Sequence, residues 1–149
     1  RSIRRQRQMC IRDRSYTGNN RTHMIRIPEQ GRFELRLMDG SANPYLLQAG
    51  VLAAGLEGMD KKINPGEPLF CNMYADYKKY PNLPKLPNNI SEALNMLGNS
   101  KVLNKAFGKK NINSYIKLKR NELNAFKKQG RFDKKRSVTK WEKDNTLDC

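Results

Sequence analysis

The sequence predicts an α+β fold in which an antiparallel β-hairpin near the start is followed by a mostly helical region. Residues 32–38 are expected to form a strand, because polar and apolar side chains alternate strictly from Arg32 to Leu37, which is typical of a strand with one buried face. Residues 21–27 form a second strand-like run, which is separated from the first by a turn with Pro and Gly at its edges, residues 28–31. Over residues 43–62 and 89–129, signals that start and end helices recur.

The hairpin is expected to have one apolar and one charged face. Successive side chains of a strand point to opposite sides, so Phe33, Leu35 and Leu37 are expected to face a core. The opposite face then carries two arginines on either side of one carboxylate: Arg32, Glu34 and Arg36.

The register of the hairpin decides which further arginines reach this face. With a four-residue turn over residues 28–31, Ile25 faces Glu34 and Arg21 shares the face of Glu34. Arg26 then lies on the far face, unless a bulge or a looser turn redirects it.

The helical region is expected to begin with a helix over residues 43–62, where Asn43 supplies the N-cap and Pro44 the first helical residue. Its many Ala and Gly residues permit close approach to a sheet or another helix, so we expect it to be buried. Residues 63–90 hold five of the seven prolines and are expected to form a long loop. Further helices are expected over residues 89–97, 100–107 and 111–129, ending at Gly98, Gly108 and Gly130.

The composition excludes several classes of protein. The chain has 149 residues, of which 30 are basic and 14 acidic, for a net charge of +16. No apolar run approaches the ~20 residues that a membrane span needs. The first arginines are not followed by the apolar block that a signal peptide has. Three cysteines are too few and too scattered for a disulfide framework or a zinc site. We therefore expect a reduced, cytoplasmic protein with no membrane partner.

The charge is concentrated at the two ends of the chain. Residues 1–14 have a net charge of +5, residues 15–100 of +1, and residues 101–149 of +10. The only basic residues in residues 1–14 are arginines, and this segment resembles translated sequencing-adapter read-through, so we expect it to be non-native; the alternative is an arginine-rich nucleic-acid-binding arm. The lysines of residues 101–149 are expected to form a solvated face, although a small basic nucleic-acid-binding protein is a competing interpretation of the whole chain.

The charged face of the hairpin is the candidate functional site. Because a strand rises ~3.3 Å per residue, Arg32, Glu34 and Arg36 lie within about 13 Å of one another on this face. One alternative is a solvated row of ion pairs, which contributes little stability. However, Arg21 and Arg26 bring the arginines to four around one carboxylate, more than pairing needs. Such an excess suits the phosphates of a nucleotide, and the carboxylate suits a hard metal ion between them.

These same residues carry a resemblance to a known family. Residues 16–28 (YTGNNRTHMIRIP) resemble the nucleotide-site segment of glutamine synthetases, and residues 32–46 (RFELRLMDGSANPYL) resemble the segment that follows it. Residues 54–58 (AGLEG) and 64–67 (NPGE) continue the resemblance, which extends more weakly over residues 15–149. It implies that residues 15–149 are about the last third of a catalytic domain, whose larger sheet includes the hairpin.

The resemblance implies a role for each charged residue. Arg21 matches an arginine that contacts both glutamate and an ATP phosphate, and Arg26 and Arg32 match arginines that contact the nucleotide phosphates. Glu34 matches a ligand of a divalent ion, Mg²⁺ or Mn²⁺. Arg36 matches the arginine that holds the glutamate substrate, so that Arg21 and Arg36 are the implied catalytic residues.

The implied activity is that of an ATP-dependent glutamate–ammonia ligase that forms glutamine through γ-glutamyl phosphate. A close variant uses methylamine or another small amine as the acceptor. Family members assemble into large rings with active sites between subunits, which implies a ring-shaped homo-oligomer for the full-length enzyme. Neither nucleic acid nor membrane is an implied partner.

The chain departs from the family pattern in several places. Met38 precedes Asp39 where the family usually has Pro, and the connection over residues 29–31 is short and lacks a lysine. The other metal ligands of the family lie upstream, so the chain alone is expected to be inactive, and His23 is expected to be a strand residue rather than a replacement ligand. Tyr74 matches a position that is adenylylated in some bacterial members; the alternative is an ordinary loop tyrosine.

Overall fold

The structure is a computed structural model that describes residues 14–38, 42–129 and 140–146. The chain divides into two compact units. The first, which we call the sheet unit, comprises Arg1–Gly40 and Pro65–Leu86; the second, the helical unit, comprises Ser41–Asn64 and Pro87–Cys149. Residues 1–13 lie outside the described part of the chain, so the expectation that residues 1–14 are non-native stays a prediction.

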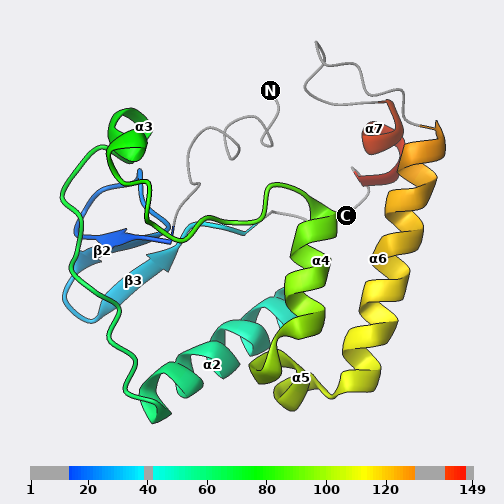
Figure 1. Cartoon of the computed structure of the whole chain (residues 1–149), viewed down its shortest axis with the longest axis horizontal. Helices are drawn as coiled ribbons and strands as arrows, with labels where there is room; N and C mark the ends of the chain where they lie inside the picture. The colour runs from blue at the N-terminus through cyan, green and yellow to red at the C-terminus, as the bar shows by residue number, and fades with distance from the viewer. Residues whose placement is uncertain (1–13, 39–41, 130–139, 147–149) are drawn as a thin grey trace. The chain divides into compact units, whose positions relative to one another are not determined.

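The sheet unit contains a three-stranded mixed sheet, with β1 (Tyr16–Thr17), β2 (Ile25–Glu29) and β3 (Arg32–Leu35) in that spatial order. Figure 1 shows β2 and β3 as neighbouring arrows. They pair antiparallel, which confirms the predicted hairpin, although its strand bounds differ: β2 covers residues 25–29 rather than 21–27, and β3 ends at Leu35 rather than at residue 38. The short strand β1, which pairs parallel to β2, was not predicted from the sequence, because two residues are too few to show a period.

The predicted register of the hairpin is wrong, because its turn is tighter than expected. Glu29 lies opposite Arg32, so that only Gln30 and Gly31 connect the strands. Gly31 has a φ of 79°, in the left-handed region that glycine adopts without steric cost. The two-residue turn by itself would pair Arg26 with Leu35 and leave the Arg26 side chain on the face opposite Glu34.

A β-bulge corrects the position of Arg26. Between the pairs Glu29–Arg32 and Arg26–Glu34, the register shifts by one residue, so that Ile27 and Pro28 together lie opposite Phe33. Pro28 has no N–H to donate to the ladder and fits such an irregular position. The bulge therefore brings Arg26 directly across from Glu34, as the sequence required if Arg26 belongs to the site.

The apolar face of β3 is not packed as predicted. The Phe33 side chain is 62% exposed, and Leu35 and Leu37 are half-buried. The physical reason is that no described helix or strand of the sheet unit packs over the apolar face of β3.

The expected loop over residues 63–90 contains two short helical turns, α3 (Met73–Asp76) and η1 (Tyr77–Lys79). The sheet unit is closed by hydrogen bonds from this segment to β1. Tyr16 donates its hydroxyl to the Gly66 carbonyl at 2.7 Å and accepts at its own carbonyl from the Leu69 N–H at 3.0 Å. These bonds hold residues 65–86 against the strands that carry the charged residues.

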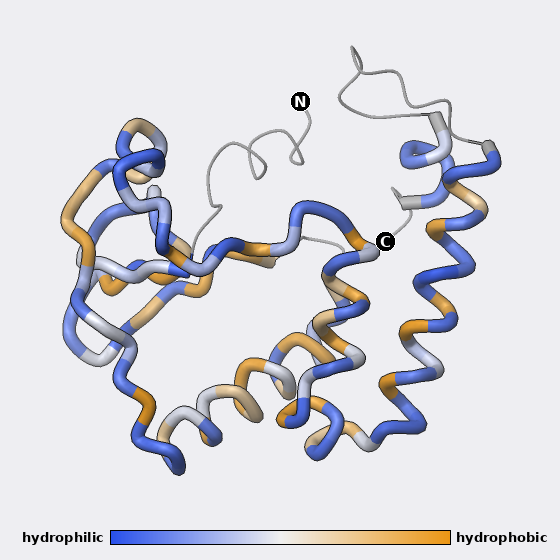
Figure 2. Tube along the Cα trace, viewed as in Figure 1, coloured by the Kyte–Doolittle hydropathy of each residue, from blue (hydrophilic) through white to orange (hydrophobic). Residues whose placement is uncertain are grey.

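The helical unit contains α2 (Pro44–Asp60), α4 (Ile90–Asn99), α5 (Lys101–Phe107), α6 (Lys109–Gln129) and α7 (Lys140–Thr146). The four predicted helices, α2, α4, α5 and α6, are therefore confirmed with small shifts at their ends, whereas α7 was not predicted from the sequence. Their core lies between α4, α5 and α6 and is formed by buried aliphatic side chains with half-buried neighbours: Leu94, Ile112, Ile116, Leu97, Leu103 and Phe107. In Figure 2, α6 is mostly hydrophilic with spaced hydrophobic residues, as expected of a helix with one buried face.

Helix α2 forms where predicted, but none of its residues is buried. It approaches α5 at Gly50, where an added Cβ would lie 3.9 Å from Leu103. Several large apolar side chains of α2 are exposed instead: Tyr45, Leu46, Leu52, Leu56 and Met59. The predicted burial is therefore wrong for the described residues, because within the helical unit only one side of α2 is covered.

Helix α7 contacts the end of α6 through two aromatic rings. The rings of Trp141 and Phe126 meet edge to face, with their centroids 5.4 Å apart. Among the described residues, no helix combines the length and hydrophobicity that crossing a membrane requires.

Candidate active site

The candidate site is centred on the carboxylate of Glu34 in β3. Its Oε2 accepts a hydrogen bond from Arg26 Nη1 at 2.8 Å, and its Oε1 accepts one from Arg32 Nη2 at 3.1 Å. The side chain of Arg26 is 13% exposed and that of Glu34 is 30% exposed, whereas Arg32 is 60% exposed. The structure thus brings three of the predicted site residues into direct contact.

Arg26 is held in place by a second acceptor. Its Nε donates to Asn19 Oδ1 at 2.8 Å, and its Nη2 donates to the same oxygen. A planar guanidinium bound along two edges has little freedom to rotate. Asn19 is a site residue that sequence reasoning missed, because its contact depends on the turn between β1 and β2.

The arginines lower the pKa of Glu34 below its ordinary value of 4.5. The largest cause is the hydrogen bond from Arg26, followed among the stabilising effects by the charges of Arg26, Arg32 and Arg21, while partial desolvation acts in the opposite direction. Glu34 is therefore ionised at neutral pH, with positive potential around it. That is the form in which a carboxylate binds a divalent cation.

Arg32 and Arg21 are the more exposed arginines of the site. Arg32 also pairs with Glu29, with 3.3 Å between Nη1 and Oε1. Arg21 lies in the turn before β2, where its backbone carbonyl accepts from the Tyr74 hydroxyl at 3.4 Å. Its charge reaches Glu34, so it shares the electrostatic environment of the site.

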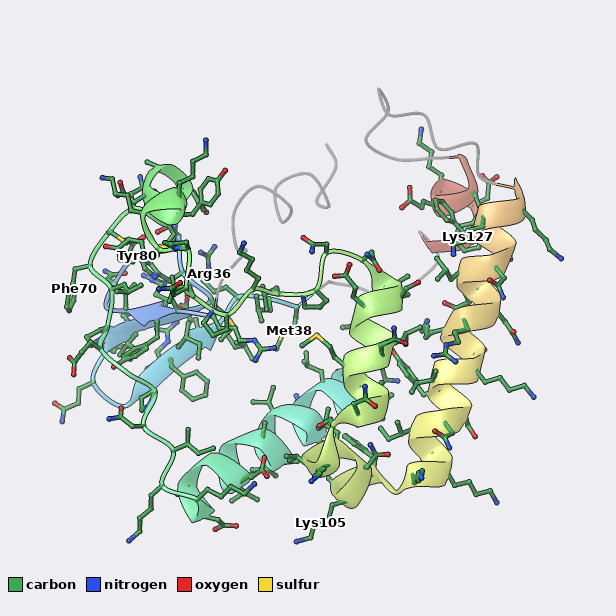
Figure 3. All side chains as sticks on the ribbon, viewed as in Figure 1. Arg36, Met38, Phe70, Tyr80, Lys105 and Lys127 are labelled. Atoms are coloured by element: carbon green, nitrogen blue, oxygen red, sulfur yellow. The ribbon has the colours of Figure 1, made fainter. Side chains whose placement is uncertain are left out.

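Arg36 is placed differently from the other arginines. It follows β3, and its N–H donates to the Met24 carbonyl at 2.9 Å. Figure 3 labels it at the sheet. Its Nη1 is buried and has no hydrogen-bond partner among the described residues. A buried guanidinium nitrogen without a partner is costly, and a bound anion would remove that cost.

His23 is not the strand residue that the sequence predicted. It lies in the turn before β2 and is fully buried, with hydrogen bonds to Ser15 and to the Cys71 carbonyl. Within the described ranges, no group of three or more His, Cys, Asp or Glu side chains is arranged to hold a metal ion.

Comparison with known proteins assigns this arrangement to a family. A family model described as "Glutamine synthetase, catalytic domain" matches residues 12–144. The chain belongs to the glutamine synthetase family. A glutamine synthetase of Rhizobium meliloti (strain 1021) is 46% identical over 134 residues, which are 90% of this chain and 29% of that protein. A glutamate–methylamine ligase of Methyloversatilis universalis is 40% identical over 111 residues, which are 72% of this chain and 24% of that protein.

Solved structures show the same family fold. A structure described as "GmaS/ADP complex-Conformation 1" matches with a TM-score of 0.76 and 40% identity, over 95% of this chain and 31% of that one. One described as "Apo GmaS without ligand" matches with a TM-score of 0.74 and 41% identity, over 93% of this chain and 30% of that one. The chain thus spans less than a third of the length of these relatives and has the α+β fold of part of the glutamine synthetase catalytic domain.

Proposed function

We propose that this chain is part of an ATP-dependent ligase that joins the side-chain carboxylate of glutamate to ammonia. The observation that carries the proposal is the ionised Glu34 between Arg26 and Arg32, in a chain of the glutamine synthetase family. Family membership also favours a ligase over the nucleic-acid-binding alternative. Because ATP and glutamate are cytoplasmic metabolites, the proposal places the enzyme in the cytoplasm.

Arg26, Arg32 and Arg21 would bind the phosphates of ATP. The first two lie within hydrogen-bond distance of Glu34, and the charge of the third reaches it. Three positive charges around one negative charge leave an excess of positive potential, which suits a polyanion. Arginine donors fixed before the reaction can stabilise the charge that develops during phosphoryl transfer.

Glu34 fits the role of one ligand of Mg²⁺ or Mn²⁺. It supplies the hard oxygen donor that these ions prefer, and the arginines keep it ionised. Each carboxylate oxygen has a second lone pair beyond the one that accepts from arginine. The described residues supply no complete ligand set, so further ligands would come from elsewhere in the ligase. A bound divalent ion would neutralise phosphate charge.

Arg36 would bind the glutamate substrate. Its buried Nη1, which has no partner in the described part of the chain, is a donor that an anion could engage, and a guanidinium can bind a carboxylate through two parallel hydrogen bonds. Arg21, whose backbone is fixed near Tyr74, would contact both substrates. Arg21 and Arg36 are therefore the proposed catalytic residues.

The proposed reaction has two steps. The side-chain carboxylate of glutamate attacks the γ-phosphorus of ATP, which forms γ-glutamyl phosphate and releases ADP. The amine then attacks the acyl carbon, phosphate leaves with the bonding electron pair, and the nitrogen loses a proton to give the amide. The arginines of this chain would orient the two anionic reactants and offset their repulsion.

Methylamine is the second candidate acceptor. The relatives include a glutamate–methylamine ligase, and both solved structures described above are of GmaS. The acceptor can be identified by incubating the complete ligase with glutamate, ATP and Mg²⁺ plus either ammonia or methylamine, and measuring ADP and the amide product. Amine-dependent ADP release supports the proposal, and the amide that forms shows which amine is the acceptor. Absence of ADP release with both amines, from folded enzyme, would contradict it.

We further propose that the complete ligase forms a ring-shaped homo-oligomer, as the family resemblance implies. Sedimentation of the complete ligase measures this directly. A monomer at assay concentration would overturn the assembly proposal and leave the ligase proposal intact.

A further inference from the structure

The largest fully buried side chain of the described residues is His23, which the proposed reaction does not use. Its Nε2 lies 2.9 Å from the Cys71 carbonyl oxygen and its Nδ1 lies 2.7 Å from Ser15 Oγ. A carbonyl oxygen only accepts, so Nε2 carries the proton and donates it. In the neutral ring, Nδ1 then accepts from the Ser15 hydroxyl, and both ring nitrogens are satisfied.

Other bonds fasten the same turn to the same neighbouring segment. Asn20 Nδ2 donates to the Cys71 carbonyl at 2.9 Å, so this oxygen accepts from two side chains of the turn. The Met73 N–H donates to Thr22 Oγ1 at 3.1 Å. Thr22 is in turn held by Asn20, whose Oδ1 accepts from both its N–H and its hydroxyl at 2.9 Å. The turn is thus clamped to residues 71–73 at several points.

This clamp determines where two arginines of the site lie. Arg21 sits inside the clamped turn, and Arg26 follows three residues after His23 in β2. Their side chains are long and flexible, so the positions of their backbones limit where the guanidinium groups can reach. A displacement of about 1 Å in a binding group can cost on the order of a hundredfold in rate.

We infer that His23 is a positioning residue for the phosphate-binding arginines: its bond to the Cys71 carbonyl fixes the turn that places Arg21 and Arg26 around Glu34. His23 itself touches no reactant. This inference rests on the proposed function, because it concerns the same arginines, and it adds a requirement that lies outside the charged cluster.

Two amide substitutions separate the bond from simple burial. In His23→Gln, the side-chain amide reaches approximately to the position of Nε2 and can still donate to Cys71. In His23→Asn, the amide is one methylene shorter, lies near the position of Nδ1 and loses the Cys71 bond. Ser15→Ala is a milder second variant that removes only the partner of Nδ1, which keeps the inference testable if His23→Asn does not fold.

The test measures kcat and the KM for ATP and for the amine in the complete ligase. We expect His23→Asn to raise the KM for ATP about tenfold, which corresponds to about 1.4 kcal/mol, with little change in the KM for the amine. His23→Gln should stay within about threefold of wild type, and Ser15→Ala should lie between the two.

Ile116→Val, in the core of the helical unit, is the stability control. It should lower Tm and leave the KM for ATP unchanged. A His23→Asn enzyme with lowered Tm but wild-type KM for ATP would overturn the inference, because burial alone would then explain His23. If the wild-type enzyme releases no ADP at all, the proposed function fails; in that case, amide hydrogen exchange in the chain itself still decides whether His23→Asn loosens residues 20–26, and unchanged protection would refute the clamp.

Discussion

The two carboxylate oxygens of Glu34 each accept a hydrogen bond from a different arginine. The importance of its negative charge can therefore be tested directly by substitution. Glu34→Gln keeps the shape and removes the charge. We expect turnover of the complete ligase to fall at least about a hundredfold, because a neutral amide is a poor ligand for Mg²⁺ or Mn²⁺ and no longer pairs with the arginines. Steady-state kcat as a function of metal concentration measures this.

Glu29→Gln is the matched control for that substitution. Glu29 also pairs with Arg32, at 3.3 Å, but its side chain is 67% exposed, and among the ion pairs of the described residues it has none with Arg26. It should retain most of the activity, since exposed ion pairs contribute little. Near-normal turnover of the Glu34→Gln enzyme would contradict the proposal that Glu34 is a metal ligand.

The lowered pKa of Glu34 predicts a particular dependence of stability on pH. A carboxyl whose pKa is lower in the folded than in the unfolded chain stabilises the fold above its ordinary value of 4.5, and this contribution is lost as the pH falls through the folded pKa. The difference in unfolding free energy between wild type and Glu34→Gln should therefore be constant near neutrality and shrink below pH 4.5. Urea denaturation of the chain at a series of pH values checks this, and a difference that grows in acid would contradict it.

Arg36 should affect binding and stability in opposite ways. Arg36→Ala in the complete ligase is expected to raise the KM for glutamate more than the KM for ATP, whereas equal losses would contradict its assignment. Arg36→Met keeps the unbranched side chain up to about the position of Nε and removes a buried donor that has no partner among the described residues, so the chain should be as stable as wild type or up to about 1 kcal/mol more stable. Urea denaturation of this variant distinguishes a substrate-binding arginine from a structural one.

Two helical glycines differ in the space around them. An added Cβ at Gly55 in α2 meets no atom of the described residues within 4 Å, whereas at Gly98 in α4 it would lie 3.3 Å from Ile116 Cδ1. Gly55→Ala should therefore stabilise the chain by about 0.5–1 kcal/mol through helix propensity. Gly98→Ala should gain less, because the buried Ile116 side chain must shift. Far-UV circular dichroism during urea denaturation measures both, and equal gains would show that the contact is unimportant.

Local signals in the sequence predicted the starts of the helices well. Asn43, Asn89 and Ser100 each accept at their side chains from a backbone N–H three residues on, as caps do. Gly98 misled because a glycine can serve close packing rather than helix termination; α4 continues past it to Asn99. Capping depends on a few neighbouring residues, whereas packing depends on another helix, which the local sequence does not contain.

The candidate site was predictable in part for the same reason. The alternation of the strand predicted that Arg32, Glu34 and Arg36 share one face. The contact between Arg26 and Glu34, however, depends on a one-residue bulge. The buried place of His23 depends on Cys71, 48 residues away. Long-range contacts of this kind leave no period in the sequence. The resemblance to the family implied the roles of the charged residues, and the structure shows the contacts that hold these residues in place.

Helix α2 exposes a set of large apolar side chains. The side chains of Leu52, Leu56 and Met59 are 62%, 50% and 75% exposed, and their spacing places them on one face of the helix. Figure 2 shows α2 as one of the more hydrophobic segments of the helical unit. The relatives are more than three times longer than the part that this chain matches, so we predict that the rest of the ligase covers this face.

That prediction is testable by making one substitution in two contexts. Leu52→Asp should change the unfolding free energy of the chain alone by no more than about 0.5 kcal/mol, because the side chain is already in water. In the complete ligase it should cost about 2 kcal/mol or more, since a buried leucine is replaced by a charge. Leu118→Asp is the control, because Leu118 is 55% exposed on the polar helix α6, and it should be tolerated in both contexts. If Leu52→Asp is equally mild in both, α2 faces solvent in the ligase as well, and its apolar face must have another partner.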